Sequence, residues 1–367
     1  MTIHTFDFDL TMLHLNAKWA FTTRRVNRDD VTGLDPAVAL GVAGDLVLCD
    51  ITEINQHQKI QLASGRASTS YVGDKVVLCI GDRYAPDQFE GAARITANGA
   101  DLLAGGGVVG TMEHAHDRMA EPTKLRPIGL LTDRTEEVIN IARYGLPSVQ
   151  IPDHVTVIGV FGASMNAGKT TAAVSLAHGL SRAGFSVAGV KATGTGAFSD
   201  FNAFEDAGVS AMDFTDAGMP TTYRMPMDRV EQGFETLVGT AAANGADIVV
   251  VEIADGVFQQ ETQEVLAGSS ICDRLDGILF ATPDALGAVG GARVLADYGL
   301  QPFAMSGKLT QSPLAMMEAK RATGIPQLSR LDLCTPSAVM AVARDVLRVS
   351  KPHKAAEPLE IEQMTAA

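Results

Sequence analysis

Residues 158–171 read IGVFGASMNAGKTT, and no other stretch of the chain restricts its fold as strongly. An apolar run gives way to small residues and then to Lys169 and Thr170, and a helical pattern follows over 170–184. A glycine-rich turn between a buried strand and a helix presents backbone N–H groups and the positive end of the helix dipole to an anion. We therefore predict a phosphate-binding turn in which Lys169 reaches terminal phosphates and the Thr170 hydroxyl ligates magnesium.

The spacing departs from the strict form G-x-x-x-x-G-K-[ST], because one extra residue separates Gly162 from Gly168 and Ala163 stands at the usual first glycine. The residues predicted to contact the phosphates are Gly162, Ala163, Ser164, Asn166, Ala167, Gly168, Lys169, Thr170 and Thr171. Two other interpretations stay open. The turn either caps the helix and does nothing else, or it holds another phosphate-containing ligand such as coenzyme A.

From residue 155 onward, buried strands alternate with helical stretches. The predicted strands cover 155–161, 186–191, 247–253, 277–282 and 302–306, and each is a continuous apolar run. Continuous runs are typical of strands buried on both faces, which favours a mostly parallel sheet with flanking helices, an α/β fold. The stretch 229–245 places Val230, Phe234, Leu237, Val238 and Ala241 on one helical face, and a last helix is predicted from about 337 to 349.

The first 150 residues have a different pattern of apolar and polar residues. Short apolar runs at 44–51, 73–80 and 106–112 are separated by polar turns, which predicts a smaller β-rich domain. The first two runs both begin with Gly-Asp. This similarity indicates either a duplicated hairpin or two similar turns. A chain of 367 residues exceeds the usual size of one core, so we predict a β-rich domain at 1–150, a P-loop domain at 154–350 and a disordered tail at 351–367.

Composition limits the classes of partner. A formal charge of -14 and a pI near 5.0 argue against nucleic acid or an anionic membrane as the main partner, since both need clustered Lys and Arg. The four cysteines are widely spaced and suggest neither a zinc site nor a disulfide framework. The acidic start MTIHTFDFDL does not resemble a secretory signal, and no run of about 18 apolar residues occurs. We expect a cytoplasmic protein.

Several motifs, in order, resemble one family. The loop GASMNAGKT resembles that of dethiobiotin synthetase and its relatives in the cobyrinate amidotransferase and ParA-like branch of P-loop proteins. VKATGTGAFSD, VVVEIADG and the segment from PDALGAVGG to SGKLTQSP resemble this family's later strand ends and loops. A second resemblance is to the dethiobiotin-synthetase-like family that includes D-glutamate N-acetyltransferase-type proteins, which also carry an N-terminal domain.

The resemblance implies residue roles. Thr170, Asp200 and Glu252 would hold magnesium, which prefers hard oxygen ligands. Lys169 and Lys191 would flank the transferred phosphoryl group or a substrate carboxylate and neutralise its developing charge. Two of these residues have a simpler interpretation as well: Lys191 as an ion-pair partner of Glu252, and Asp200 as part of a helix N-cap.

The resemblance also implies that Thr193, Thr195 and Arg224 contact the substrate, and a planar guanidinium suits a carboxylate. The chain departs from dethiobiotin synthetase in three places: Ser164 replaces an acid, residues 254–256 read Ala-Asp-Gly, and residues 306–308 replace an adenine-side Asn. These differences count against the dethiobiotin substrate and against adenine specificity.

Two further clusters occur before residue 130. His114 and His116 would share one side of a strand and so form a metal pair or two polar residues on a wet face. Arg118, Lys124 and Arg126 form a basic group that would bind an anion or be ordinary solvated charge.

The function that these patterns indicate is an ATP- and magnesium-dependent ligase. It would activate a carboxylate or carbamate of a small amine- or carboxylate-bearing metabolite to form an amide or ureido bond, and the family implies a homodimer. Two alternatives are an acyl-coenzyme A-dependent N-acyltransferase and a switch ATPase that acts on a protein partner. Ser164 and Met165 stand where ParA-type switches carry an early lysine, which counts against the switch.

Overall fold

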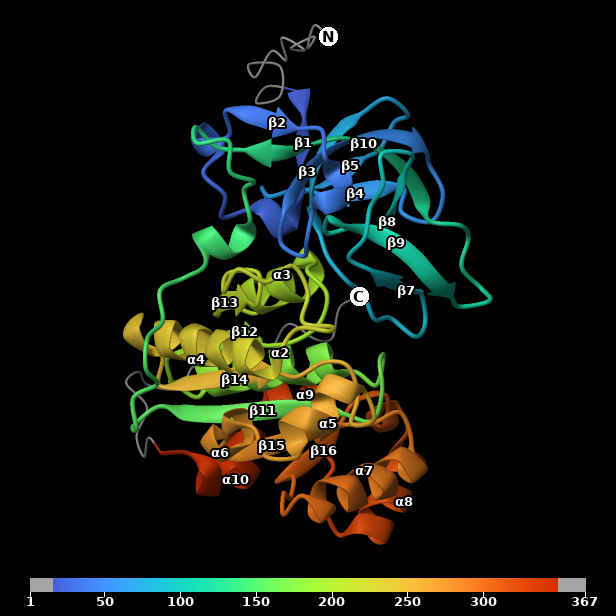
Figure 1. Ribbon diagram of the computed structural model, residues 1–367. Helices are drawn as coiled ribbons and strands as arrows, with labels where there is room; N and C mark the ends of the chain where they lie inside the picture. Colours follow the sequence, from blue (N-terminus) through green and yellow to red (C-terminus); the bar gives the residue numbers. More distant parts are fainter. Residues whose placement is uncertain (1–15, 349–367) are drawn as a thin grey trace, which may run out of the picture. The chain divides into compact units, whose positions relative to one another are not determined.

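The computed structural model describes residues 16–348, which form two compact units (Figure 1). The first unit contains the described residues up to Pro147 together with Thr193–Asp200 and Asp213–Gly233. The second contains Ser148–Ala192, Phe201–Met212 and the described residues from Phe234 onward. The predicted domain ranges 1–150 and 154–350 stay predictions, and the tail 351–367 lies outside the described residues.

The first unit is β-rich, as predicted. Its strands are β1 (Lys18–Trp19), β2 (Gly33–Asp35), β3 (Leu46–Glu53), β4 (Lys59–Gln61), β5 (Ala67–Thr69), β6 (Lys75–Ile80), β7 (Phe89–Ala92), β8 (Ala100–Ala104), β9 (Val108–Ala115) and β10 (Thr123–Thr132). Strands β6, β3, β10, β8 and β9 pair in this order, and a parallel pairing of β6 with β9 closes the ring. The described strands therefore form a small barrel, to which β1, β2 and β7 are added at the sides.

The two Gly-Asp runs encode the same turn twice. Gly44 and Gly73 have φ of 96° and 92°, which is the left-handed region that glycine adopts without steric cost. The following carboxylates, of Asp45 and Asp74, accept hydrogen bonds from the backbone N–H three residues earlier, at 2.9 and 2.8 Å. The strands that leave these turns, β3 and β6, lie side by side and antiparallel.

The second unit is built on a six-stranded sheet in the order β13-β12-β14-β11-β15-β16. Its strands are β11 (Thr156–Gly162), β12 (Val187–Lys191), β13 (Ser210–Asp213), β14 (Ile248–Glu252), β15 (Gly277–Ala281) and β16 (Ala304–Ser306). Strands β12, β14, β11, β15 and β16 are neighbours in this order, and each pairs in parallel with the next, which confirms the predicted mostly parallel sheet. All five predicted strands are present, and β13 was not predicted.

The helices are α2 (Lys169–Arg182), α3 (Phe198–Asp206), α4 (Met227–Ala243), α5 (Gln260–Leu266), α6 (Ser270–Arg274), α7 (Ala285–Asp297), α8 (Pro313–Thr323), α9 (Arg330–Cys334) and α10 (Pro336–Ala343). All five residues of the predicted apolar face of α4 are buried. The last helix is shorter than predicted, because a 3-10 turn, Arg344–Val346, follows Ala343. Within residues 16–348 no helix has the length and apolar character needed to span a bilayer.

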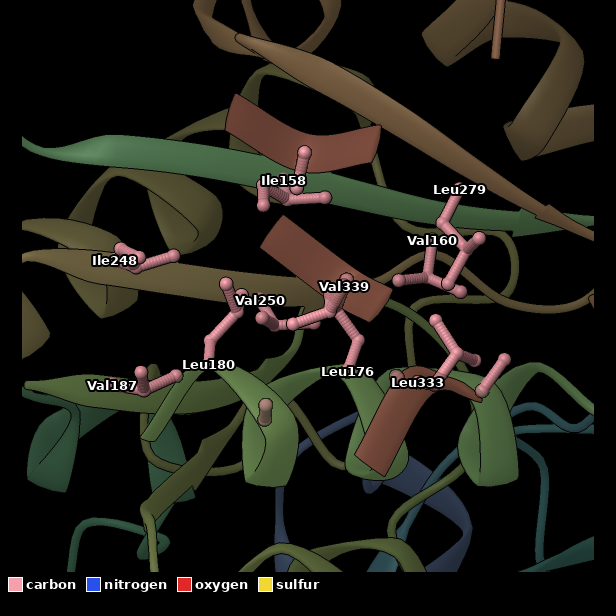
Figure 2. Close-up of a cluster of buried hydrophobic side chains, with 14 of the residues drawn as sticks. Ile158, Val160, Leu176, Leu180, Val187, Ile248, Val250, Leu279, Leu333 and Val339 are labelled. Carbon is pink, nitrogen blue, oxygen red and sulfur yellow. The ribbon is translucent and has the colours of Figure 1, made fainter. Parts of the chain in front are cut away.

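One hydrophobic core fixes α2 against the sheet (Figure 2). Because side chains alternate along a strand, Ile158 and Val160 of β11 share one face, and Leu176 and Leu180 of α2 pack against it. Burying each such leucine contributes about 1.5–3 kcal/mol. Val339 of α10 belongs to the same core. The packing therefore holds the start of α2 directly beyond the end of β11.

Strand β16 lies at one margin of the sheet. On its outer side the Met305 N–H donates to the Pro326 carbonyl and the Leu328 N–H donates to the Met305 carbonyl, both at 2.8 Å. The segment before α9 thus satisfies the outward-facing backbone groups of Met305.

Candidate functional site

The turn between β11 and α2 has the shape expected of a phosphate loop. Gly168 precedes α2 with a φ of 101°, and Asn166 also has a positive φ, 61°. A Cβ at Gly162 would lie 2.7 Å from Lys169 Cγ, so glycine is needed there for the lysine stem to pass. Strand, loop and helix are therefore arranged as in P-loop nucleoside triphosphatases, which confirms the P-loop fold of this half of the chain.

Lys169 lies under this loop. Only 6% of the residue is exposed. Its ammonium donates to the Ser164 carbonyl at 3.0 Å and to the Asp255 carbonyl. A buried ammonium is stable only when such oxygens surround it, so the fold holds a positive charge at the base of the phosphate loop.

A second group of polar side chains lies at the carboxyl ends of β12 and β14. The Thr170 hydroxyl donates to the Glu252 Oε1 at 2.9 Å, and Glu252 is 2% exposed at the end of β14. Lys191, the last residue of β12, is the register partner of Glu252. Parallel strands end at the same margin of the sheet, so Lys169, Thr170, Lys191 and Glu252 gather where open α/β sheets bind ligands.

The segment after β14, residues 254–259, is bound tightly to the phosphate loop. The Val257 N–H donates to the Gly162 carbonyl at 3.0 Å. A Cβ at Gly256 would lie 2.7 Å from Ser164 Cα, so the two backbones touch. At the other end of the segment the Thr262 hydroxyl, on α5, donates to the Ala254 carbonyl at 3.0 Å.

The segment after β16 touches the phosphate loop from the other side. The Lys308 N–H donates to the Ala167 carbonyl at 3.0 Å. Gly307 has a φ of 99°, and a Cβ there would lie 2.4 Å from the Ala167 carbonyl oxygen. On the adjoining turn the Asp284 carboxylate accepts from the Gly287 N–H at 2.7 Å and caps α7.

The remaining predicted residues group with the first unit, and their roles stay predictions. Asp200 lies in the first turn of α3, which begins at Phe198, so Ser199 and Asp200 are inside the helix and not at its cap. Thr195 forms an antiparallel bridge with Thr221. Thr193 is 3% exposed.

Arg224 is engaged by carboxylates of its own unit. Its guanidinium lies 3.3 Å from Asp82 Oδ1, 3.1 Å from Glu90 Oε1 and 3.2 Å from Glu113 Oε2. The Tyr223 hydroxyl donates to Glu90 at 2.8 Å, and this bond and that of His114 lower the pKa of Glu90. Burial and the same bond raise the pKa of Tyr223 to about 12. In this arrangement the guanidinium that was predicted to bind a substrate carboxylate already binds three protein carboxylates.

The clusters before residue 130 are likewise engaged within the first unit. His114 Nδ1 lies 2.7 Å from Glu90, whereas His116 Nδ1 accepts from the Arg118 N–H at 3.1 Å. Lys124 pairs with Asp101 at 3.0 Å, and Arg126 pairs with Asp50. In the part of the chain that the structure describes, no three His, Cys, Asp or Glu side chains are grouped to hold a metal ion.

The sequence marks residues 254–256 and 306–308 as departures from the family pattern, but it does not reveal that both segments support the phosphate loop. The carbonyl of Asp255 and the N–H of Lys308 make backbone contacts, which carry no residue-type signal. The available clue was a glycine shortly after each of two strand ends, Gly256 four residues after β14 and Gly307 directly after β16, because close backbone approach requires glycine.

Comparison with known proteins identifies no family for this chain. No protein-family model matches it, and no curated protein matches it. Among 174 matching solved chains is the signal recognition particle 54 kDa protein of Aeropyrum pernix K1 in complex with GDP. The identity is 17% and the TM-score 0.34 over 54% of this chain and 47% of that one. The match thus spans about half of that protein, and a TM-score this low supports no inference about function.

Proposed function

We propose that the second unit binds a magnesium–nucleoside triphosphate and transfers its terminal phosphoryl group. The observation that carries the proposal is the buried Lys169 ammonium at the base of a glycine-lined loop, at the strand ends that also present Glu252 and Lys191. A helix start with this geometry suits an anion, and two lysines supply the charge that a polyphosphate needs.

The residues present fit a magnesium ion. The Thr170 hydroxyl and the Glu252 carboxylate are hard oxygen donors, and their oxygens are already 2.9 Å apart. When bound, the ion would neutralise the charge that develops on the phosphate oxygens. Asp200 stays the predicted third ligand.

The finer proposal is a ligase of the dethiobiotin-synthetase-like branch. A carboxylate or carbamate oxygen of a small metabolite attacks the terminal phosphorus, and ADP leaves with the electrons of the broken P–O bond. An amine then attacks the carbonyl carbon of the acyl phosphate and expels inorganic phosphate, which forms an amide or ureido bond. Lys169 and Lys191 stabilise the charge on the phosphoryl group in flight.

Calorimetry tests the nucleotide site. Purified protein is titrated with MgATP and, separately, with acetyl-coenzyme A. The variant Lys169→Met keeps the aliphatic stem over Gly162 and removes the ammonium. We expect ATP affinity to fall by about tenfold to a hundredfold, the worth of a charge-assisted hydrogen bond. Lys308→Ala is the matched control, because its backbone N–H makes the contact with the loop.

Two results would overturn parts of the proposal. Binding of acetyl-coenzyme A without ATP binding would replace phosphoryl transfer by N-acyl transfer. ATP binding that Lys169→Met leaves unchanged would mean that the nucleotide is held elsewhere.

Trapping with hydroxylamine tests the ligase step. An acyl phosphate reacts with hydroxylamine to a hydroxamate, so a panel of small carboxylates incubated with protein, MgATP and hydroxylamine reports the activated substrate. We expect hydroxamate with at least one carboxylate and none with Lys191→Ala. Phosphate release without any hydroxamate would leave a triphosphatase and exclude carboxylate activation for that panel.

A further inference from the structure

We propose that Thr262, on α5, is a positioning residue for Lys169. This inference rests on the proposed nucleotide site and names a residue that prepares it from outside the phosphate loop. Thr262 is buried, with 2% of the residue exposed. Its hydroxyl oxygen lies 3.0 Å from the Ala254 carbonyl oxygen and 2.9 Å from Gln259 Oε1. Ala254 and Gln259 are the first and the last residue of the segment 254–259.

Thr262 therefore joins the two ends of this segment. A hydroxyl carries one proton, which Thr262 shares between the Ala254 carbonyl and Gln259 Oε1. The Thr262 backbone N–H also donates to Gln259 Oε1, at 2.9 Å, as the cap of α5. The Gln259 Nε2 donates to the Glu261 carboxylate, so the amide is oriented with Oε1 toward Thr262. A loop whose ends are held together has fewer conformations, and its middle residues are restricted as a result.

The middle residues of the segment are the ones that meet the phosphate loop. The Asp255 carbonyl accepts from the Lys169 ammonium. At the next residue, a Cβ on Gly256 would lie 2.7 Å from Ser164 Cα, so the segment has no space to approach the loop more closely. The shape of the segment thus decides where the Asp255 carbonyl stands, and that carbonyl is one of the oxygens that place the Lys169 ammonium.

Accurate placement of Lys169 matters more for the transition state than for the bound nucleotide. A flexible triphosphate adjusts to an ammonium that is slightly displaced, whereas the phosphoryl group in flight passes through one geometry. We therefore expect loss of the Thr262 hydroxyl to lower kcat for phosphate release from MgATP by about tenfold. The KM for MgATP should stay within about threefold of the wild-type value.

Two substitutions separate positioning from packing. Thr262→Val keeps the shape of the side chain and removes the hydroxyl, whereas Thr262→Ser keeps the hydroxyl and removes a buried methyl group. Each should lower the urea midpoint of the second unit by a similar small amount. A residue that served stability alone would give both variants the same kcat, but we expect kcat to fall in Thr262→Val and to stay near the wild-type value in Thr262→Ser. Gln263→Ala, at an exposed position of α5, is the matched control.

Amide hydrogen exchange tests the placement of the segment without nucleotide. In peptides covering 254–259 we expect Thr262→Val to raise exchange by about fivefold to tenfold over the wild type, as loss of one buried hydrogen bond would. Thr262→Ser and Gln263→Ala should exchange like the wild type. Peptides of α2 should exchange alike in all four proteins, which shows that the second unit is folded.

The outcomes distinguish the inference from the proposed function. Unchanged exchange or unchanged kcat in Thr262→Val would overturn the positioning role, and so would an equal loss of kcat in Thr262→Val and Thr262→Ser. The proposed function stands in each of these cases if calorimetry shows that MgATP binds to the wild type. If calorimetry shows no binding of MgATP, the proposed function fails and the positioning role fails with it.

Discussion

In the first unit, β3 runs antiparallel to its neighbours β6 and β10, so loops leave the barrel in both directions. In the second unit, the strands from β12 to β16 in the sheet all run the same way. Residues that follow those strands therefore gather at one margin, where Lys169, Lys191 and Glu252 meet. The shared direction of the strands, more than the composition, therefore explains why the charged side chains of the candidate site lie together in the second unit.

Buried charged residues of the first unit form ion pairs with one another. The Arg24 guanidinium lies 2.8 Å from Asp213 Oδ1 and 2.5 Å from Asp216 Oδ2, and all three side chains are mostly buried. Burial raises the pKa of Asp216 in spite of Arg24. The pairs fasten a later segment of the chain to its own unit, so their loss should cost stability and not ligand binding.

The largest effect is expected for Arg24→Ala. It leaves two buried carboxylates without their cation, which should lower the free energy of unfolding by about 3–5 kcal/mol. Urea unfolding followed by the fluorescence of Trp19, the single tryptophan of the chain, measures this unit directly. Arg25→Ala is the control: its side chain is 37% exposed and lies 3.9 Å from Asp216, so we expect at most about 1 kcal/mol. Equal losses in both variants would contradict the structural role given to Arg24.

Gly179→Ala should be nearly as damaging to the second unit. A Cβ there would lie 1.9 Å from the Leu333 carbonyl oxygen, and backbone cannot move aside cheaply. We expect a loss of about 3 kcal/mol, as for other overpacked cores. Circular dichroism follows the unfolding of the helices, while Trp19 fluorescence should keep its wild-type midpoint. A matching shift at Trp19 would show that the two units unfold together.

His57 predicts a pH dependence confined to the first unit. Burial, and then the charge of Arg83, lower its pKa from 6.5 to about 4. Between these values the unfolded chain binds a proton that the folded chain does not, so stability falls as pH falls through this window. Allowing for partial solvent screening, the loss should reach about 2 kcal/mol.

The comparison of wild type with His57→Gln isolates this contribution. The variant should lack that part of the pH slope in urea unfolding followed at Trp19. Identical slopes for both proteins would mean that His57 is protonated in the folded state.

The smallest effect is a gain. A Cβ at Gly290, on the exposed side of α7, would have no heavy atom within 4 Å. Gly290→Ala should therefore raise the stability of the second unit by about 0.5–1 kcal/mol through helix propensity alone. In thermal unfolding, we expect the midpoint temperature to fall for Gly179→Ala and to rise for Gly290→Ala. A loss for Gly290→Ala would indicate that this face of α7 is covered in solution.

The sequence predicted the second unit well for a physical reason. Strands buried on both faces, such as β14, read as unbroken apolar runs, and a phosphate loop needs Gly162 and Gly168 at fixed places. Strand β13 was missed because its four residues, Ser-Ala-Met-Asp, carry little apolar signal.

The sequence could not predict interactions that depend on distant chain segments. Asp82, Glu90 and Glu113 are far from Arg224 along the chain, so their pairing with an arginine that the family resemblance placed at the substrate could not be predicted. The closure of the barrel by β6 and β9 and the contact of Lys169 with Asp255 are likewise products of tertiary folding.

The hydrogen bonds between residues 326–328 and the outer side of β16 affect the tendency of the protein to aggregate at high concentration. A strand with unsatisfied outward N–H and C=O groups is a template on which another chain can add a strand, which is how sheets begin to aggregate. The segment 326–328 occupies that template at Met305 with bonds of its own. Deleting or loosening this short segment would therefore be expected to promote intermolecular strand pairing at Met305.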